Sequence, residues 1–264
     1  MNLTHKPQQT PVTKDSAQYS APALSKGLRV LEYLSDCGGP STTQEIAKEL
    51  NVTRNEIFRV IAVLEMEGYL LKAGTPQGYV ISGRLLELGL KEPQINDIFE
   101  VVSPLADNLT KTTGVPCQLV FASRDEMIVI RRWEPKDRLS ISVPVGSRRD
   151  LEVTASGIAM LCSMSAEELS RTSDEIQKRN PSFSQDELST YRSDLQIHGY
   201  LKFNSRLMDS VIDVSAPLVS KSGQVIGALT VPYTNNATCE CTITEIGSML
   251  SEISKHVSRQ LIRS

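Results

Sequence analysis

The sequence predicts an α+β protein with two domains, and three observations lead to this expectation. The chain is 264 residues long, which exceeds one ordinary small domain and suits two domains that each bury a core. In its first part, apolar residues recur at steps of three and four, the spacing of an amphipathic helix. After Gly114 the pattern changes to short apolar strands between separate helices, which favours an antiparallel sheet with helices packed on it.

Composition narrows the functional classes. Hydrophobic residues make up 40% of the chain and charged residues 22%, as in globular proteins. No apolar run reaches the roughly eighteen residues that a membrane span needs, so we expect no membrane partner. Residues 1–23 are rich in Thr, Gln, Pro and Ser and contain no signal-peptide core, which predicts a disordered tail. The five scattered cysteines favour the reducing cytoplasm, and a net charge of −3 means that DNA binding must depend on local placement of charges.

The first domain, residues 24–90, is expected to begin with three helices. The first helix has one apolar face, formed by Leu24, Leu28, Leu31 and Leu34. A Thr followed three residues later by Glu forms a capping box, which often begins a helix, and this pattern starts at Thr42 and again at Thr53. The helix after Thr53 carries apolar residues at Ile57, Val60, Ile61 and Leu64. Two short helices joined by a tight turn are typical of the helix-turn-helix motif, whose second helix enters the major groove of DNA.

A β-hairpin is expected next, with strands at 69–72 and 79–81, and it would form a wing. The resulting winged helix-turn-helix predicts double-stranded operator DNA as a partner, with docking of another protein as the alternative. Contacts are expected from outward-facing residues: Thr43, Thr53, Arg54, Asn55, Phe58, Arg59, Lys72 and Gln77. Arg side chains pair with guanine edges or phosphates and Asn pairs with adenine, whereas Glu56 is assigned to its capping box.

The second domain, residues 114–264, is expected to follow a linker helix at 91–113. Gly and Pro at 89–94 interrupt the pattern, and apolar residues from Ile95 to Leu109 then resume helical spacing. Strands are expected at 118–122, 127–132, 139–143, 211–218 and 224–231. Helices are expected at 154–162, 165–172, 184–198 and 243–257, with capping boxes that end on Glu168 and Glu187.

Short segments along the chain occur in the order and spacing of one known family: Ser25–Leu31, Gln44–Leu50, Glu67–Leu70, Gly83–Gly89, Val145–Arg148, Thr154–Gly157, His198–Tyr200, Ser215–Pro217 and Gly223–Leu229. Through them the chain resembles the IclR family of transcription regulators, from about residue 24 to 263. The resemblance implies that the second domain is GAF-like and binds an effector between its sheet and a loop leading into the helix at Thr154. Asn55 and Glu56 stand where the family often has Ser or Thr, which leaves the operator sequence open.

The effector site that the resemblance implies contains Phe121, Thr154, Ala155, Ser156, Gly157, Phe203, Asp213 and Thr230. A helix start offers unpaired backbone NH groups and a positive dipole end, which suits a carboxylate or a phosphate. The alternative is that Thr154 only caps its own helix. For Phe121, and for Trp133, packing in the core is the alternative to stacking on a ligand.

Asp213 is the most unusual residue of this set, because many relatives have a cysteine there. A partly buried carboxylate needs a partner, and we favour the ligand over an ion pair with Arg131, Arg132 or Arg206. Thr230 takes the place of a family serine, and Phe203 stands where relatives often carry an acidic residue. The polarity of the site therefore differs from that of relatives that bind simple keto acids.

These features predict a transcription regulator whose operator binding is controlled by a small polar or anionic metabolite, with a carboxylate expected. Two-fold operators match two-fold proteins, so a homodimer or homotetramer is expected. A repressor is the expected mode, although the sequence alone leaves activation open. His5, His198 and His256 lie outside any nucleophile or metal motif, which predicts no catalytic residue, metal or cofactor. The rival is a metabolite-binding protein or enzyme that uses the winged helix only for assembly.

Overall fold

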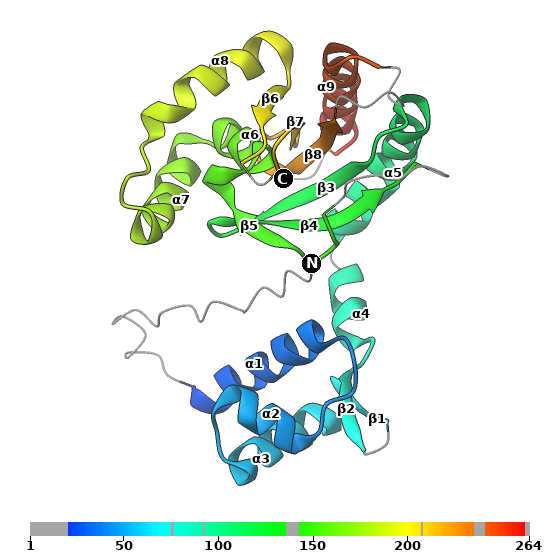
Figure 1. The fold of residues 1–264 in the computed structure, drawn as a ribbon, viewed down its shortest axis with the longest axis vertical. Helices are drawn as coiled ribbons and strands as arrows, with labels where there is room; N and C mark the ends of the chain where they lie inside the picture. The colour runs from blue at the N-terminus through cyan, green and yellow to red at the C-terminus, as the bar shows by residue number, and fades with distance from the viewer. Residues whose placement is uncertain are drawn as a thin grey trace. The chain divides into compact units, whose positions relative to one another are not determined.

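The chain divides into two units between residues 92 and 93 (Figure 1). The computed structural model describes residues 21–74, 77–91, 93–135, 143–206, 208–234 and 241–261, and only the backbone of residues 93–95. Most of the expected tail and most of the expected strand at 139–143 lie outside the described residues.

The first unit contains, in order, α1 (Pro22–Cys37), α2 (Thr43–Leu50), α3 (Arg54–Met66), β1 (Leu70–Ala73), β2 (Gly78–Ile81) and α4 (Arg84–Leu90). Both predicted capping boxes form, because the hydroxyls of Thr42 and Thr53 each accept a hydrogen bond from the glutamate NH three residues on. The antiparallel pairing of β1 with β2 makes the wing. Helix, turn, helix and hairpin thus follow one another as the winged helix-turn-helix prediction requires.

The buried face of α1 differs from the predicted one. Leu24 is 64% exposed and Leu28 is 52% exposed, whereas Gly27, Val30 and Leu34 face the core. A side-chain carbon added to Gly27 would lie 3.7 Å from Val60, so the glycine is where α1 packs against α3. The prediction for Leu24 and Leu28 was wrong because it followed the leucines and overlooked the small residue at the contact.

The second unit contains α5 (Pro93–Thr113), β3 (Cys117–Ser123), β4 (Glu126–Trp133), β5 (Arg148–Asp150), α6 (Ala155–Ser163), α7 (Ala166–Arg179), α8 (Leu188–His198), β6 (Leu201–Asn204), β7 (Val211–Val219), β8 (Val225–Thr234) and α9 (Ile243–Gln260). Its strands form a six-stranded sheet in the order β5-β4-β3-β8-β7-β6, and every pair is antiparallel. The strands expected at 118–122, 127–132, 211–218 and 224–231 are present, and they form the hairpins β3-β4 and β7-β8. The α+β class and the antiparallel sheet are therefore confirmed.

Several boundaries differ from the sequence prediction. The edge strands β5 and β6 were not predicted, because three or four residues are too few to show an alternating pattern. Helix α7 continues to Arg179, since its buried positions extend to Ile176. The capping box on Glu187 does not form: the Ser184 hydroxyl accepts from the NH of Asp186, and a short 3₁₀ turn precedes α8.

Helix α5 belongs to the core of the second unit. Its buried residues Ile98, Val102, Ala106 and Leu109 pack with α9 and the sheet. The segment expected as a linker helix is therefore, from Pro93 onward, one of the helices that cover the sheet.

The sheet has two covered faces (Figure 1). Helices α5 and α9 pack on one face, where Leu119, Val214, Leu229 and Val231 point. Helix α6 packs on the other face, with α7 and α8 outside it, where Val120, Met127, Leu201 and Ala228 point. We call these the α5/α9 face and the α6 face.

Candidate DNA-binding surface and effector site

The outer face of α3 has the character expected of a DNA-reading helix. Arg54, Asn55, Phe58 and Arg59 are exposed, while Ile57 on the opposite side is fully buried. Positions four residues apart lie on one helical face, so Arg54 neighbours Phe58 and Asn55 neighbours Arg59. Within the described part of the chain, neither arginine has an ion-pair partner.

Other basic groups of the first unit are engaged in internal contacts. Lys72 on β1 pairs with Glu65 on α3 at 2.5 Å, and Glu65 raises the pKa of this lysine. Lys26 on α1 pairs with Glu56, which also closes the α3 capping box and whose pKa is lowered by the lysine. These ion pairs hold the wing and α1 to α3. A phosphate would have to compete with Glu65 for Lys72.

The remaining predicted DNA contacts occupy the ends of their elements. The Thr53 hydroxyl is taken up in capping α3, so its hydrogen-bonding capacity is partly used. Thr43 is half-buried at the start of α2, and Gln77 is exposed beside the hairpin turn. The structure therefore gathers Arg54, Asn55 and Arg59 as the accessible polar group.

The start of α6 is closed by the turn at Leu151–Val153. The Thr154 hydroxyl accepts from the NH of Gly157 at 3.1 Å, so the cap that was the alternative role for Thr154 is present. A side-chain carbon added to Gly157 would lie 2.0 Å from the Leu151 carbonyl oxygen. Thr154, Ala155 and Ser156 are only 7%, 1% and 2% exposed. An anion could use only the NH groups of the first turn that the Thr154 hydroxyl leaves unoccupied.

Polar side chains gather on the α6 face of the central strands. By strand alternation Asp213 and Ser215 of β7 and Thr230 of β8 point to this face, because Val214 and Leu229 belong to the other. The Ser215 and Thr230 hydroxyls are 2.9 Å apart and hydrogen-bonded, and both residues are at most 2% exposed. Phe203 on β6 pairs in register with Asp213. Ser215 was not among the predicted site residues, although a polar residue within an apolar strand was the available signal.

Asp213 has a hydrogen-bond partner but no ion-pair partner among the described residues. Burial raises the pKa of its carboxyl to about 6, and a hydrogen bond with Ser205 opposes that shift. The three arginines that the sequence offered as ion-pair partners for Asp213 make other contacts. Arg131 stacks on Phe99 and Trp133, Arg132 pairs with Glu134 at 3.3 Å, and Arg206 lies over the ring of Phe203 at 5.5 Å.

Phe121 stands apart from the other predicted effector residues. It packs with the α5/α9 face, on the opposite side of the sheet from α6 and Thr230. Gly227 leaves room for its ring, since a side-chain carbon there would lie 2.8 Å from Phe121. Trp133 also belongs to the α5/α9 face. For both aromatic residues, the structure supports the alternative of core packing.

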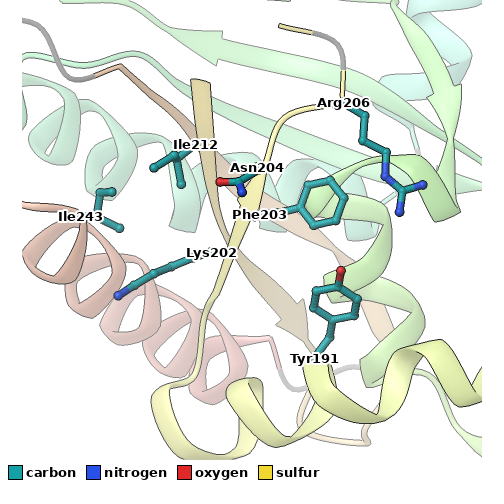
Figure 2. Close-up of a pocket in the computed structure, with 7 residues that line it drawn as sticks. All are labelled: Tyr191, Lys202, Phe203, Asn204, Arg206, Ile212 and Ile243. Atoms are coloured by element: carbon teal, nitrogen blue, oxygen red, sulfur yellow. The ribbon is translucent and has the colours of Figure 1, made fainter. Parts of the chain in front are cut away.

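A surface pocket surrounds the edge strand β6 (Figure 2). Its lining residues are Tyr191, Lys202, Phe203, Asn204, Arg206, Ile212 and Ile243. Figure 2 shows Tyr191, Phe203 and Arg206 on one side of the strand and Lys202 and Ile243 on the other. Phe203 is the one predicted effector residue in it. The pocket therefore wraps the sheet edge and does not coincide with the polar group beside α6.

Within the described ranges, no three metal-ligating side chains come together, and no helix is both long and apolar enough to cross a bilayer. Three of the described cysteines are free thiols: Cys37, Cys117 and Cys162.

Family models match both units. The IclR helix-turn-helix domain matches residues 23–74, and the bacterial transcriptional regulator IclR C-terminal domain matches residues 94–259, well over half of the chain. The chain belongs to the IclR family. This family consists of transcription regulators, so the enzyme alternative is dropped.

Curated relatives of this IclR-family chain are named repressors. The HTH-type transcriptional repressor AllR of Escherichia coli K12 is 22% identical over 250 residues, which cover 93% of this chain and 92% of the repressor. AllR of Klebsiella pneumoniae is 28% identical over 154 residues, which cover 58% of this chain and only 57% of that protein.

Solved IclR structures show the same fold. A regulator from Alicyclobacillus acidocaldarius superposes with a TM-score of 0.73 at 23% identity and covers 92% of this chain and 99% of its own. A homologue from Microbacterium hydrocarbonoxydans, complexed with 4-hydroxybenzoate, also has a TM-score of 0.73, at 18% identity, and covers 90% of this chain and 98% of its own.

Proposed function

We propose that this IclR-family protein is a cytoplasmic repressor that binds operator DNA through α3. Its affinity for the operator changes when a small carboxylic acid binds on the α6 face. The observation that carries the proposal is the outer face of α3, where Arg54, Asn55 and Arg59 are exposed and the two arginines have no ion-pair partner within the described residues. Arginine and asparagine have the hydrogen-bonding geometry that reads guanine and adenine edges.

The local character of this surface matters because the net charge of the chain is −3. An acidic protein gains little from general attraction to DNA, so its affinity must come from a few well-placed groups. The capping box at Thr53 and the ion pair between Lys26 and Glu56 fix the start of α3, where those groups lie.

A carboxylate effector is supported by two features of the α6 face. Arg132 reaches this face, since its neighbours Arg131 and Trp133 stack on the opposite side. The start of α6 adds the positive end of a helix dipole. The homologue from Microbacterium hydrocarbonoxydans, complexed with 4-hydroxybenzoate, has a carboxylate ligand on the same fold.

A dimer is supported by leucines that the first unit does not bury. Leu24 and Leu28 of α1 are exposed. Helix α4 has no buried residue, and its Leu86 is 65% exposed. Several exposed leucines in one small unit favour an interface with a second copy of the chain. A symmetric dimer would present two α3 helices to two half-sites of the operator.

The test is fluorescence anisotropy with labelled DNA flanking the gene, at two salt concentrations. Arg59→Ala is expected to weaken binding by about 1 to 3 kcal/mol. The matched control is Arg171→Ala, which removes the same exposed side chain from α7 in the second unit. A folded Arg59→Ala protein that binds as tightly as the control would remove α3 from the proposal.

A further inference from the structure

Gln118 on β3 is a buried polar residue with no assigned role. It is 7% exposed, and its neighbours Cys117 and Leu119 both pack on the α5/α9 face. Strand alternation therefore directs the Gln118 side chain to the α6 face. No hydrogen bond of its amide group is found among the described residues. The amide is not one of the fully shielded, unpartnered side-chain groups among the described residues, which are the hydroxyls of Ser103 and Thr110, so it keeps access to solvent beside the sheet and is free to meet a ligand.

The neighbours of Gln118 on the α6 face form a continuous polar row across the sheet. In register, Gln118 lies opposite Arg132 of β4 on one side and Thr230 of β8 on the other, and Thr230 lies opposite Ser215 of β7. Residues opposite each other on adjacent strands have Cβ atoms about 5 Å apart, so these side chains adjoin. The amide of Gln118 thus stands between a cation and a pair of hydroxyls.

The hydrogen-bond directions show what this row offers a ligand. The Ser215 hydroxyl donates to the carbonyl oxygen of Leu229 at 3.3 Å. Its oxygen then accepts the proton of Thr230 at 2.9 Å, which leaves the Thr230 oxygen as an acceptor. Gln118 contributes one carbonyl acceptor and an amide nitrogen with two donor hydrogens. A ligand hydroxyl fits this setting, because it accepts from the amide and donates to a neighbouring acceptor, whereas a keto group accepts only.

We propose that Gln118 is a specificity-determining residue of the effector site, and that it selects a small carboxylic acid with a hydroxyl group over the matching acid without one. Arg132, which also pairs with Glu134 at 3.3 Å, serves the carboxylate in competition with that residue, and the amide of Gln118 together with the Thr230 oxygen binds the hydroxyl. The inference rests on the proposed function for the location of the ligand, and on the unpartnered amide for the choice of residue.

The first test uses the protein without ligand. Gln118→Leu removes an amide that makes no hydrogen bond within the described residues, so the thermal transition of the second unit should not fall by more than about 2 °C. Gln118→Met keeps an unbranched side chain and should behave in the same way. Gln196→Leu, at an exposed position on α8, is the control and should change nothing. A marked fall in Tm for both Gln118 variants would show that the amide is a structural hydrogen-bonding group, and would overturn the proposal.

The second test is calorimetric titration with matched acids: glycolate against acetate, lactate against pyruvate, and 4-hydroxybenzoate against benzoate. In at least one pair the wild type should prefer the hydroxylated acid by about tenfold or more, the equivalent of one good hydrogen bond. Gln118→Leu should bring that ratio close to one. A preference that survives in Gln118→Leu, or a wild type that binds none of the hydroxylated acids, contradicts the proposal. Binding of DNA through Arg59 is measured separately, so its outcome distinguishes a wrong ligand class from a wrong function.

Discussion

Both faces of the six-stranded sheet bury an apolar cluster, but the α6 face also carries a row of polar side chains. Leu229 and Thr230 are neighbours on β8 with exposures of 0% and 2%, yet one points into an apolar core and the other into a polar row. The same alternation separates Val214 from Ser215 on β7. Burial alone therefore does not explain the sequence of these strands. Both faces supply packing energy, and the α6 face in addition retains polar groups that a purely structural layer would not need.

The largest expected effect comes from the apolar face. Leu229→Ala removes a fully buried side chain beneath α9 and should lower the free energy of unfolding by about 2 to 5 kcal/mol. Urea denaturation followed by circular dichroism measures this loss. A loss below about 1 kcal/mol would mean that the α5/α9 face is not the main stabilising core.

Asp213 should make stability depend on pH in the opposite sense to an ordinary ion pair. Its folded pKa of about 6 lies above the unfolded value of 3.8, because burial favours the neutral acid. The free-energy cost of burying the ionised carboxylate is absent below the unfolded pKa. It grows as the pH rises toward 6 and is complete above that pH. Asp213→Asn should therefore be more stable than the wild type at pH 8, by up to about 3 kcal/mol, and equally stable near pH 3. The measurement is the Tm of the wild type and of Asp213→Asn across this pH range. A wild type that is more stable than the variant at pH 8 would point to an ion pair of the aspartate.

Thr230→Val provides the matched comparison with Leu229→Ala on the same strand. The shape is conserved, and Ser215 still donates to the Leu229 carbonyl, so the loss should be about 1 kcal/mol or less. Binding of the hydroxylated acid should weaken nonetheless. Urea denaturation and calorimetry on one sample separate the two effects. Equal losses of stability at residues 229 and 230 would remove the distinction between the faces.

The smallest effect concerns thiol chemistry and leaves stability unchanged. Burial raises the pKa of Cys117 on the α5/α9 face to about 12, and that of Cys162 to about 11, so neither forms thiolate near neutral pH. Cys37 at the end of α1 is exposed. Labelling with iodoacetamide, read by peptide mass spectrometry, should modify Cys37 first and Cys117 only after unfolding. Early modification of Cys117 would show that the apolar face opens in the native state.

The sequence predicted the fold class well because its signals are local. Capping boxes at Thr42, Thr53 and Ser165 depend on residues three apart, and each formed. The strands expected at 211–218 and 224–231, on either side of the turn at 220–223, indicated the central hairpin. The edge strands and the 3₁₀ turn before α8 were missed because they are short and depend on neighbours in space.

The effector site was harder to predict, because it depends on which helices cover each face of the sheet. Phe121 and Gln118 lie three residues apart on β3, and nothing in their spacing tells which of them meets α6. Pairing of β3 with β8 places Gln118 beside Thr230 and directs Phe121 to the opposite face. The resemblance to the IclR family located the start of α6, but not the polar row that crosses the sheet beneath it.

The most direct test of the account is the effect of ligand on DNA affinity. Anisotropy of the labelled flanking DNA is measured with the wild type and with Gln118→Leu, each with and without a saturating concentration of the hydroxylated acid that wins the calorimetric comparison. Allosteric coupling typically changes an affinity by about 5- to 150-fold, so the wild type should show a change of at least fivefold. Gln118→Leu should bind DNA like the ligand-free wild type at the same ligand concentration. Equal DNA affinity of the wild type with and without bound acid would contradict the account, since the α6 face would then bind a ligand that α3 does not sense.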